Sequence, residues 1–143
     1  MLEPKDMRRR KDRIIIETNL WISFILTDDS SKLDEVINED SSVLLFSIEL
    51  LEELIDVASR PKFRKYFPTE DLISLLYQIE KNSELINVVS SVEISRDPKD
   101  NFLLSLAQDG QATHLISGDK DLTEIGKFGE TVILTISEYL KEK

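Results

Sequence analysis

The sequence predicts an α/β domain in which a parallel sheet of four to five strands lies between two layers of helices. Helical and strand-like periods alternate along nearly the whole chain, which is typical of a parallel sheet. The strand-like runs are continuously apolar, as expected for strands covered on both faces. With 143 residues, 41% of them hydrophobic, the chain is long enough for one such domain and its core.

Four apolar runs are the predicted strands, and a fifth segment is open between two structures. Residues 86–89 fit either an edge strand or an extended connection. Short runs rich in Ile, Val and Leu and bounded by polar residues favour strands. The four runs are 13–16, 43–46, 114–117 and 132–134.

Helices are predicted between the strands from apolar spacing and capping residues. Ser47 suits the N-cap of a helix over 48–59, and Asp97-Pro98 joins a capping Asp to a proline at the first helical position. Gly110 is expected to close this second helix. The other expected helices cover 19–26; 31–38, capped by Ser30 or Ser31; a stretch opening at Pro68-Thr69 with Leu72, Leu75, Leu76 and Ile79 on its apolar face; 121–126; and 136–142.

Composition limits the kinds of site that the chain can build. It has no cysteine and a single histidine, His114, which excludes disulfides, thiolate zinc sites and imidazole-rich metal sites. A metal would be a hard cation with oxygen ligands, such as Mg²⁺ or Mn²⁺. His114 opens a strand and is expected to be structural. No apolar run has the roughly 18 residues of a membrane span, and Met1 to Arg13 lacks a signal-peptide centre, so a cytoplasmic location is expected.

The net charge of −10 argues against nucleic acid as a partner, because phosphate contacts usually need a basic surface. Two local basic clusters soften this objection. One lies in a polar tail over residues 1–12, ahead of the domain over 13–143. This first cluster is either an RNA contact or part of a disordered tail, and the second is either an RNA contact or a solvated turn. The clusters are Arg8-Arg9-Arg10-Lys11, and Arg60, Lys62, Arg64 and Lys65.

Acidic residues follow two of the predicted strands. Glu17-Thr18-Asn19 comes directly after the first strand, and Gly118-Asp119-Lys120-Asp121 follows the strand ending at Ser117. Ligands of open parallel sheets bind outside the carboxyl ends of the strands. The two segments are therefore candidates for one site, although loops after strands are often polar without any function.

Two helices carry further candidate acids. Asp100 lies in the first turn of its helix and heads the stripe of Leu103, Leu106 and Ala107, so its carboxylate is expected to point inward. An inward carboxylate is costly without a partner, and a metal ion is one way to meet that cost; support of the helix dipole is the alternative. In the helix from Ile48, Glu52 and Glu53 flank the apolar face, whereas Glu49 and Asp56 are expected to point to solvent.

These residues, in this order, resemble the PIN-domain family, in particular the ribonucleases that act as toxins of bacterial toxin–antitoxin pairs. The resemblance covers roughly residues 13 to 140 and chooses Glu53 over Glu52. Each motif is weak alone, and their common order makes them informative. They are Glu17-Thr18-Asn19; Ser47 with Glu53-Leu54; Arg96-Asp97-Pro98-Lys99-Asp100 with Ala107; and Ser117-Gly118-Asp119-Lys120-Asp121-Leu122.

The resemblance implies an RNA-hydrolysing site that uses Mg²⁺ or Mn²⁺, an antitoxin partner and a homodimer. It places the antitoxin groove at the helices of residues 21–26 and 51–57, where Trp21 would be either core or partner-facing. The implied metal ligands and catalytic residues are Glu17, Glu53, Asp100 and Asp119, with Thr18, Asn19 and Ser117 orienting ligands or touching phosphate; Asp121 either holds a metal-bound water or caps its helix.

The first acid departs from the family pattern, in which it is normally Asp and here is Glu17. The extra methylene moves the carboxylate by about 1.5 Å, and active sites respond to displacements on the order of 1 Å. A working site, a weakened nuclease and a PIN-like module that binds RNA or protein without cutting all remain open. A phosphoacceptor receiver domain is disfavoured, because no pair of adjacent acids follows the first strand.

Overall fold

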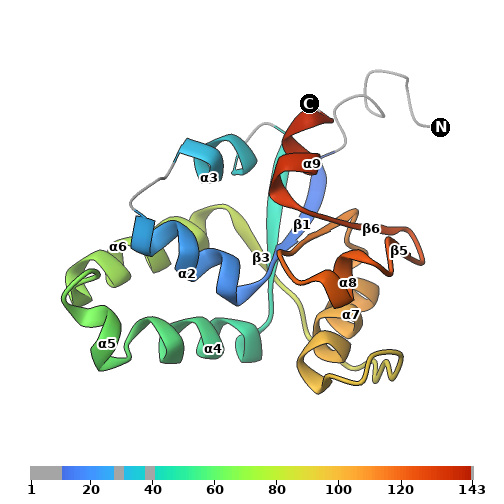
Figure 1. The fold of residues 1–143 in the computed structure, drawn as a ribbon, viewed down its shortest axis with the longest axis horizontal. Helices are drawn as coiled ribbons and strands as arrows, with labels where there is room; N and C mark the ends of the chain where they lie inside the picture. The colour runs from blue at the N-terminus through green and yellow to red at the C-terminus, as the bar shows by residue number, and fades with distance from the viewer. Residues whose placement is uncertain (1–10, 28–30, 38–40, 143) are drawn as a thin grey trace.

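The sheet at the centre of the computed structural model has six strands in the order β3-β2-β1-β4-β6-β5 (Figure 1). Its neighbours pair in parallel, except that β5 is antiparallel to β6. The structure describes residues 11–27, 31–37 and 41–142, so most of the predicted basic tail lies outside it. The strands are β1 (Asp12–Ile16), β2 (Ser42–Phe46), β3 (Ser83–Leu85), β4 (His114–Ile116), β5 (Lys127–Phe128) and β6 (Thr131–Leu134).

The parallel α/β class and its four apolar strands are confirmed. Two strands were not predicted. The edge strand β3 precedes residues 86–89 rather than including them, so that segment is the extended connection. The two-residue strand β5 turns back to β6 through Gly129, whose φ of 58° is the left-handed conformation that glycine adopts at little cost.

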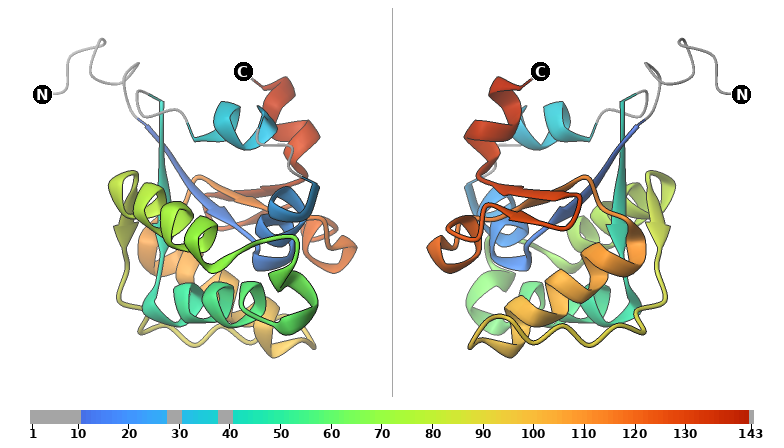
Figure 2. Two further views of the ribbon diagram at one scale, coloured as in Figure 1. Left: turned by 90° about the vertical axis from the view of Figure 1, so that its left-hand side faces the viewer. Right: turned by 90° about the vertical axis from the view of Figure 1, so that its right-hand side faces the viewer.

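Helices cover both faces of the sheet, as predicted. Figure 2 shows α4, α5 and α6 in front of the sheet from one side and α7 in front of it from the opposite side. The helices are α2 (Thr18–Thr27), α3 (Ser31–Val36), α4 (Ile48–Ala58), α5 (Pro61–Arg64), α6 (Thr69–Lys81), α7 (Pro98–Gly110), α8 (Lys120–Thr123) and α9 (Ile136–Lys141). No helix of the described residues combines the length and hydropathy that crossing a bilayer requires.

The predicted caps of α4 and α7 are confirmed. The Ser47 hydroxyl accepts a hydrogen bond from the Leu50 amide at 3.0 Å, and the Asp97 carboxylate accepts one from the Lys99 amide at 2.9 Å. Ser30, a possible cap of α3, lies outside the described residues. The unpredicted helix α5 begins with Pro61 at its first position, a place where proline's missing N–H is no loss.

Gly110 was predicted to close α7, and the structure corrects the reason for a glycine there. Gly110 is the last helical residue, and the left-handed residue that follows is Gln111, with φ 51°. A β-carbon on Gly110 would lie 3.0 Å from Leu45 and 3.1 Å from Ile86. The glycine therefore serves close packing of α7 on the sheet.

The core lies between the sheet and its helices. Ile14, Ile15 and Ile16 of β1 are at most 2% exposed, and Trp21, which was open between core and partner surface, is 1% exposed. Trp21 packs beside Phe46 with 6.0 Å between ring centroids. This packing fixes α2 against the end of β2, which pairs with β1; the first candidate acid follows β1.

Candidate active site

The candidate site lies where the direction of strand addition reverses. From β1 the chain adds β2 and β3 on one side, and it later returns through α7 to add β4 on the other. Ligands of open α/β sheets bind at such switch points, outside the carboxyl ends of the strands. Glu17 directly follows β1, and its amide donates to the Ile116 carbonyl at 3.1 Å. Asp119 follows β4 three residues later, beside it.

Three of the four predicted metal ligands meet at this point. Carboxylate oxygens of Glu17, Asp100 and Asp119 all lie within 4.8 Å of one another. They line a cleft of about 330 Å³ between the sheet edge, α4 and α7. The first and third acids come from strand ends and the second from a helix start, so residues far apart in sequence form one acidic cluster.

Asp100 is held in place by its helix. It is 3% exposed, in the first turn of α7, above the buried Leu103 and Leu104. Its Oδ2 accepts a hydrogen bond from the Ser95 hydroxyl at 3.3 Å. The inward direction predicted from the apolar stripe is therefore confirmed. Asp100 shares the buried face of α7 with Leu103 and Leu104, which directs its carboxylate away from solvent.

Asp119 is oriented by the turn that joins β4 to α8. Its amide donates to the Ser117 hydroxyl at 2.9 Å, and its Oδ1 accepts the Asp121 amide at 2.9 Å, which makes it the N-cap of α8. Ser117 is fully buried. The capping role fixes the Asp119 carboxylate. It also corrects the second possibility raised for Asp121, because Asp119 caps the helix and Asp121 is an exposed residue of its first turn.

Glu17 reaches the cluster despite its longer side chain. It is half-buried, and the Ser117 hydroxyl and the Gly118 amide act to lower the pKa of its carboxyl. Ser117 therefore lies near both strand-end acids. The Glu that departs from the family pattern occupies a position from which its oxygen meets those of Asp100 and Asp119.

The electrostatics of the cluster favour a bound cation. Burial raises the pKa of the Glu17 carboxyl, and the charges of Asp119 and Asp100 add to the rise, against the lowering effect of the Ser117 hydroxyl and the Gly118 amide. Burial also raises the pKa of the Asp100 carboxyl, and Asp119 and Asp97 add to it. Within the described residues, none of the three clustered acids forms an ion pair. The ionised forms of Glu17 and Asp100 are therefore destabilised, and a cation would relieve this.

The donor set fits a hard divalent ion. All three donors are carboxylate oxygens, the ligands that Mg²⁺ and Mn²⁺ prefer. With metal–oxygen distances of about 2.1 Å, octahedral ligands lie about 3 Å apart at adjacent corners and about 4.2 Å apart at opposite ones. Oxygens within 4.8 Å need only small side-chain movements to reach that geometry.

The fourth predicted ligand, Glu53, lies on the facing wall of the same cleft, outside the cluster. Its Oε1 is 3.7 Å from the Lys99 Nζ. Glu52 is not among the residues that line the cleft, whereas Glu53 is; the choice of Glu53 as a metal ligand stays a prediction. Of the residues predicted to orient ligands or phosphate, Thr18 and Asn19 also line the cleft, and Thr18 is 5% exposed.

Sequence reasoning missed two residues of the cleft. Glu49 was expected to point to solvent, and it is exposed but lines the cleft at the first turn of α4. Lys99 was noted only as part of a motif. Both depend on how α4 approaches α7, which no local pattern encodes. The lysine next to an inward-pointing Asp was the available signal.

Comparison with known families decides what kind of domain this is. The family described as PIN domain matches residues 13–121, well over half of the chain. The chain belongs to the PIN-domain family. The matched range contains the four acids and ends at Asp121, whereas the last strand pair and α9 lie beyond it. No curated protein and no solved structure matched the chain. PIN domains are generally metal-dependent nucleases, which agrees with the donor set of the cleft.

Proposed function

We propose that this PIN domain is a divalent-metal-dependent endoribonuclease of the toxin type, which hydrolyses phosphodiester bonds of RNA in the cytoplasm. The observation that supports it most is the convergence of Glu17, Asp100 and Asp119 at the switch point in a chain of this family. An antitoxin protein as partner and a homodimer are part of the same proposal and rest on the family resemblance alone.

In this proposal the three clustered carboxylates hold Mg²⁺ or Mn²⁺, and Glu53 completes the site from the facing wall. The ion supplies Lewis-acid stabilisation of the negative charge that develops on phosphate oxygens. The Ser117 hydroxyl orients the Asp119 turn, and the α8 cap fixes Asp119. Such supporting contacts keep ligands in the geometry that metal binding needs.

Thr18 and Asn19 begin α2 at the rim of the cleft. Their position beside Glu17 suits contacts to a phosphate or to the first acid. Phe102 and Leu103 form the apolar part of the wall on α7. An apolar wall lowers the local dielectric, which strengthens charge interactions inside the cleft.

The test is cleavage of a labelled single-stranded RNA in Mn²⁺ by the natural chain, Glu17→Asp and Asp100→Asn. We expect cleavage by the natural chain and none by Asp100→Asn. Equal inactivity of all three would remove the nuclease proposal and favour a PIN-like module that binds RNA or protein without cutting. Activity only in Glu17→Asp would mean that the extra methylene weakens the site. Calorimetric titration with Mn²⁺ separates loss of the ion from loss of chemistry.

A further inference from the structure

The cleft has an unusual charge balance for a site that would receive a polyanion. Six carboxylates line the cleft. Among the described residues that line it, Lys99 is the one basic residue. RNA phosphates are repelled by such a surface unless cations are present. The affinity of the cleft for RNA phosphate therefore depends on how Lys99 and the carboxylates interact.

Lys99 joins the two walls of the cleft. It lies on α7, one residue before Asp100, and its Nζ is 3.7 Å from Oε1 of Glu53 on α4. Its backbone is fixed, because Pro98 starts the helix and the Lys99 amide donates to the Asp97 carboxylate. Only the side chain is free to move, and it is 79% exposed.

The ion pair itself is weak. An exposed pair at this separation contributes little to stability, so breaking it costs little. Glu53 is 36% exposed and faces the cluster across the cleft. An ammonium is a flexible point charge that can contact phosphate from many directions. These features suit an exchange of partners better than a structural bridge.

We propose that Lys99 is the phosphate-positioning residue of the cleft, and that Glu53 holds it until a divalent cation binds. Glu53 then turns from Lys99 to the cation, and the released ammonium meets the RNA backbone. This inference rests on the proposed function, since it assigns the substrate contact of that same site. It explains why Glu53 lies apart from the other three acids in the free protein.

If Glu53 exchanges Lys99 for the cation, substitution of Lys99 should change the affinities for Mn²⁺ and for RNA in opposite directions. Lys99→Gln removes a positive charge that competes with the cation for Glu53, so Mn²⁺ should bind about threefold to tenfold more tightly. The same change removes one phosphate contact, so RNA should bind about fivefold to tenfold more weakly near 50 mM salt, with the salt slope reduced by about 0.7. A residue that merely held α4 to α7 would not separate the two affinities.

The measurements are Mn²⁺ titration by calorimetry and anisotropy of a labelled 12-nucleotide RNA in Ca²⁺, with intact RNA verified on a gel. Lys127→Gln is the control, because it removes the same charge from an exposed position on β5, outside the cleft. Lys99→Arg keeps the charge and should retain RNA binding. Glu53→Gln should weaken Mn²⁺ binding and strengthen metal-free RNA binding more than Glu49→Gln, which removes a cleft acid of the same helix.

Opposite shifts in Lys99→Gln, absent from Lys127→Gln, would support the exchange. If the natural chain binds both Mn²⁺ and RNA but Lys99→Gln changes neither affinity, or weakens both, this inference alone is overturned. If the natural chain binds no Mn²⁺, the proposed function is overturned together with the exchange.

Discussion

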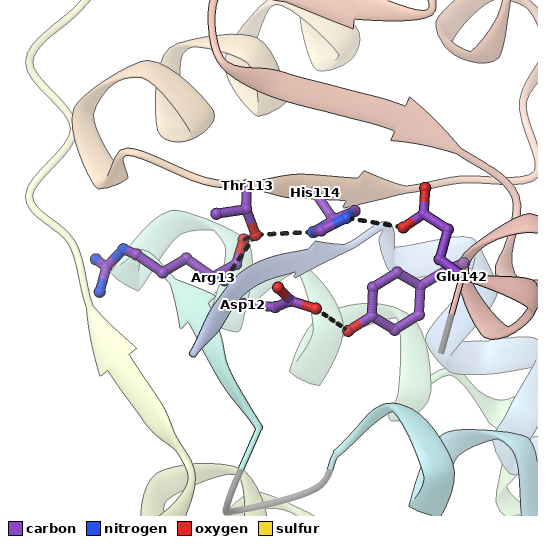
Figure 3. Close-up of polar contacts among 6 residues, drawn as sticks. Asp12, Arg13, Thr113, His114 and Glu142 are labelled. Carbon is purple, nitrogen blue, oxygen red and sulfur yellow. Dashed lines mark hydrogen bonds and ion pairs between the residues drawn. The ribbon is translucent and has the colours of Figure 1, made fainter. Parts of the chain in front are cut away.

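The two ends of the central strands differ in how their charged side chains are balanced. At the carboxyl ends of β1 and β4, Glu17 and Asp119 meet Asp100 without an ion pair among the described residues. At the amino ends of the same strands, Asp12, Arg13 and His114 each have a partner. Figure 3 shows the contacts of Asp12 and His114, and the contact of the Arg13 backbone with Thr113. The same pair of strands thus carries an unbalanced cluster at one end and a balanced network at the other.

The partners at the amino end come from three distant segments. The buried Tyr139 hydroxyl donates to Asp12 at 2.7 Å. Arg13 donates to the Gly110 carbonyl at 2.9 Å and to both oxygens of Glu84 at 3.2 and 2.7 Å. These hydrogen bonds from Arg13 lower the pKa of the Glu84 carboxyl. They tie β1 to β3, to the end of α7 and to α9.

The contrast separates stability from function. Polar groups with satisfied partners specify where α9 and β3 dock. Carboxylates whose pKa is raised by burial and by each other cost stability, and such groups concentrate at functional sites. We therefore expect substitutions at the two ends to have opposite effects, and the following experiments test this.

The largest expected effect is on catalysis by Asp119→Asn. The amide oxygen keeps the cap of α8, so the fold should persist, while one charged donor to the ion is lost. We expect Mn²⁺-dependent RNA cleavage to fall by about 100-fold or more. Asp12→Asn, at the opposite end of the sheet, should leave the rate within about twofold, since it is remote from the reacting groups. Similar losses in both variants would contradict the separation.

The next effect is on stability, from Tyr139→Phe. Burial raises the pKa of the Tyr139 hydroxyl, which stays protonated and donates to Asp12. Its removal takes a hydrogen bond from a charged acceptor, so the free energy of unfolding should fall by about 1.5–3 kcal/mol. Urea unfolding measures this, and Tyr77→Phe, at a 63% exposed position, is the control. An unchanged midpoint would mean that water replaces the lost donor.

A smaller effect of opposite sign is expected from Asp100→Asn in EDTA. The folded-state pKa of Asp100 is raised, so the unfolded chain loses this proton at lower pH than the folded one. The resulting cost is absent below the unfolded pKa, grows as pH rises toward the folded pKa, and persists above it. Asp100→Asn should therefore unfold at higher urea at pH 7, by about 1 kcal/mol, with the gain vanishing near pH 3. If Asp100→Asn lowered the free energy of unfolding at pH 7, the ionised Asp100 carboxylate would not destabilise the fold.

Much of this arrangement follows from local sequence patterns. Continuous runs such as Ile14-Ile15-Ile16 identify buried strands, and the stripe behind Asp100 shows that its carboxylate points inward. Glu17 follows β1 directly and Asp119 lies three residues after β4, so the parallel order brings them to one edge. The resemblance added the choice of Glu53 over Glu52, which helical spacing alone left open.

The remainder depends on contacts between distant elements. The strand β3 is short and mostly exposed, so it has no apolar run to identify it, and it is defined by pairing with β2. The strand β5 has two residues and exists through its turn to β6. The Lys99–Glu53 ion pair requires α4 and α7 to face each other. The hydrogen bond between Tyr139 and Asp12 joins residues 127 positions apart in the sequence.

The smallest expected effect is that of Glu142→Gln. This substitution tests whether the Glu142–His114 contact or the Tyr139–Asp12 hydrogen bond contributes more to stability at the amino ends of the strands. Glu142 is 50% exposed and lies 3.2 Å from His114 Nε2, whereas His114 Nδ1 meets the Thr113 hydroxyl at 2.8 Å and its ring packs edge-on against Tyr139. The exposed contact should contribute less than about 1 kcal/mol. Glu130→Gln controls for the change in net charge. If Glu142→Gln destabilised the protein as much as Tyr139→Phe, the contact with His114 rather than the buried hydroxyl would hold α9 in place.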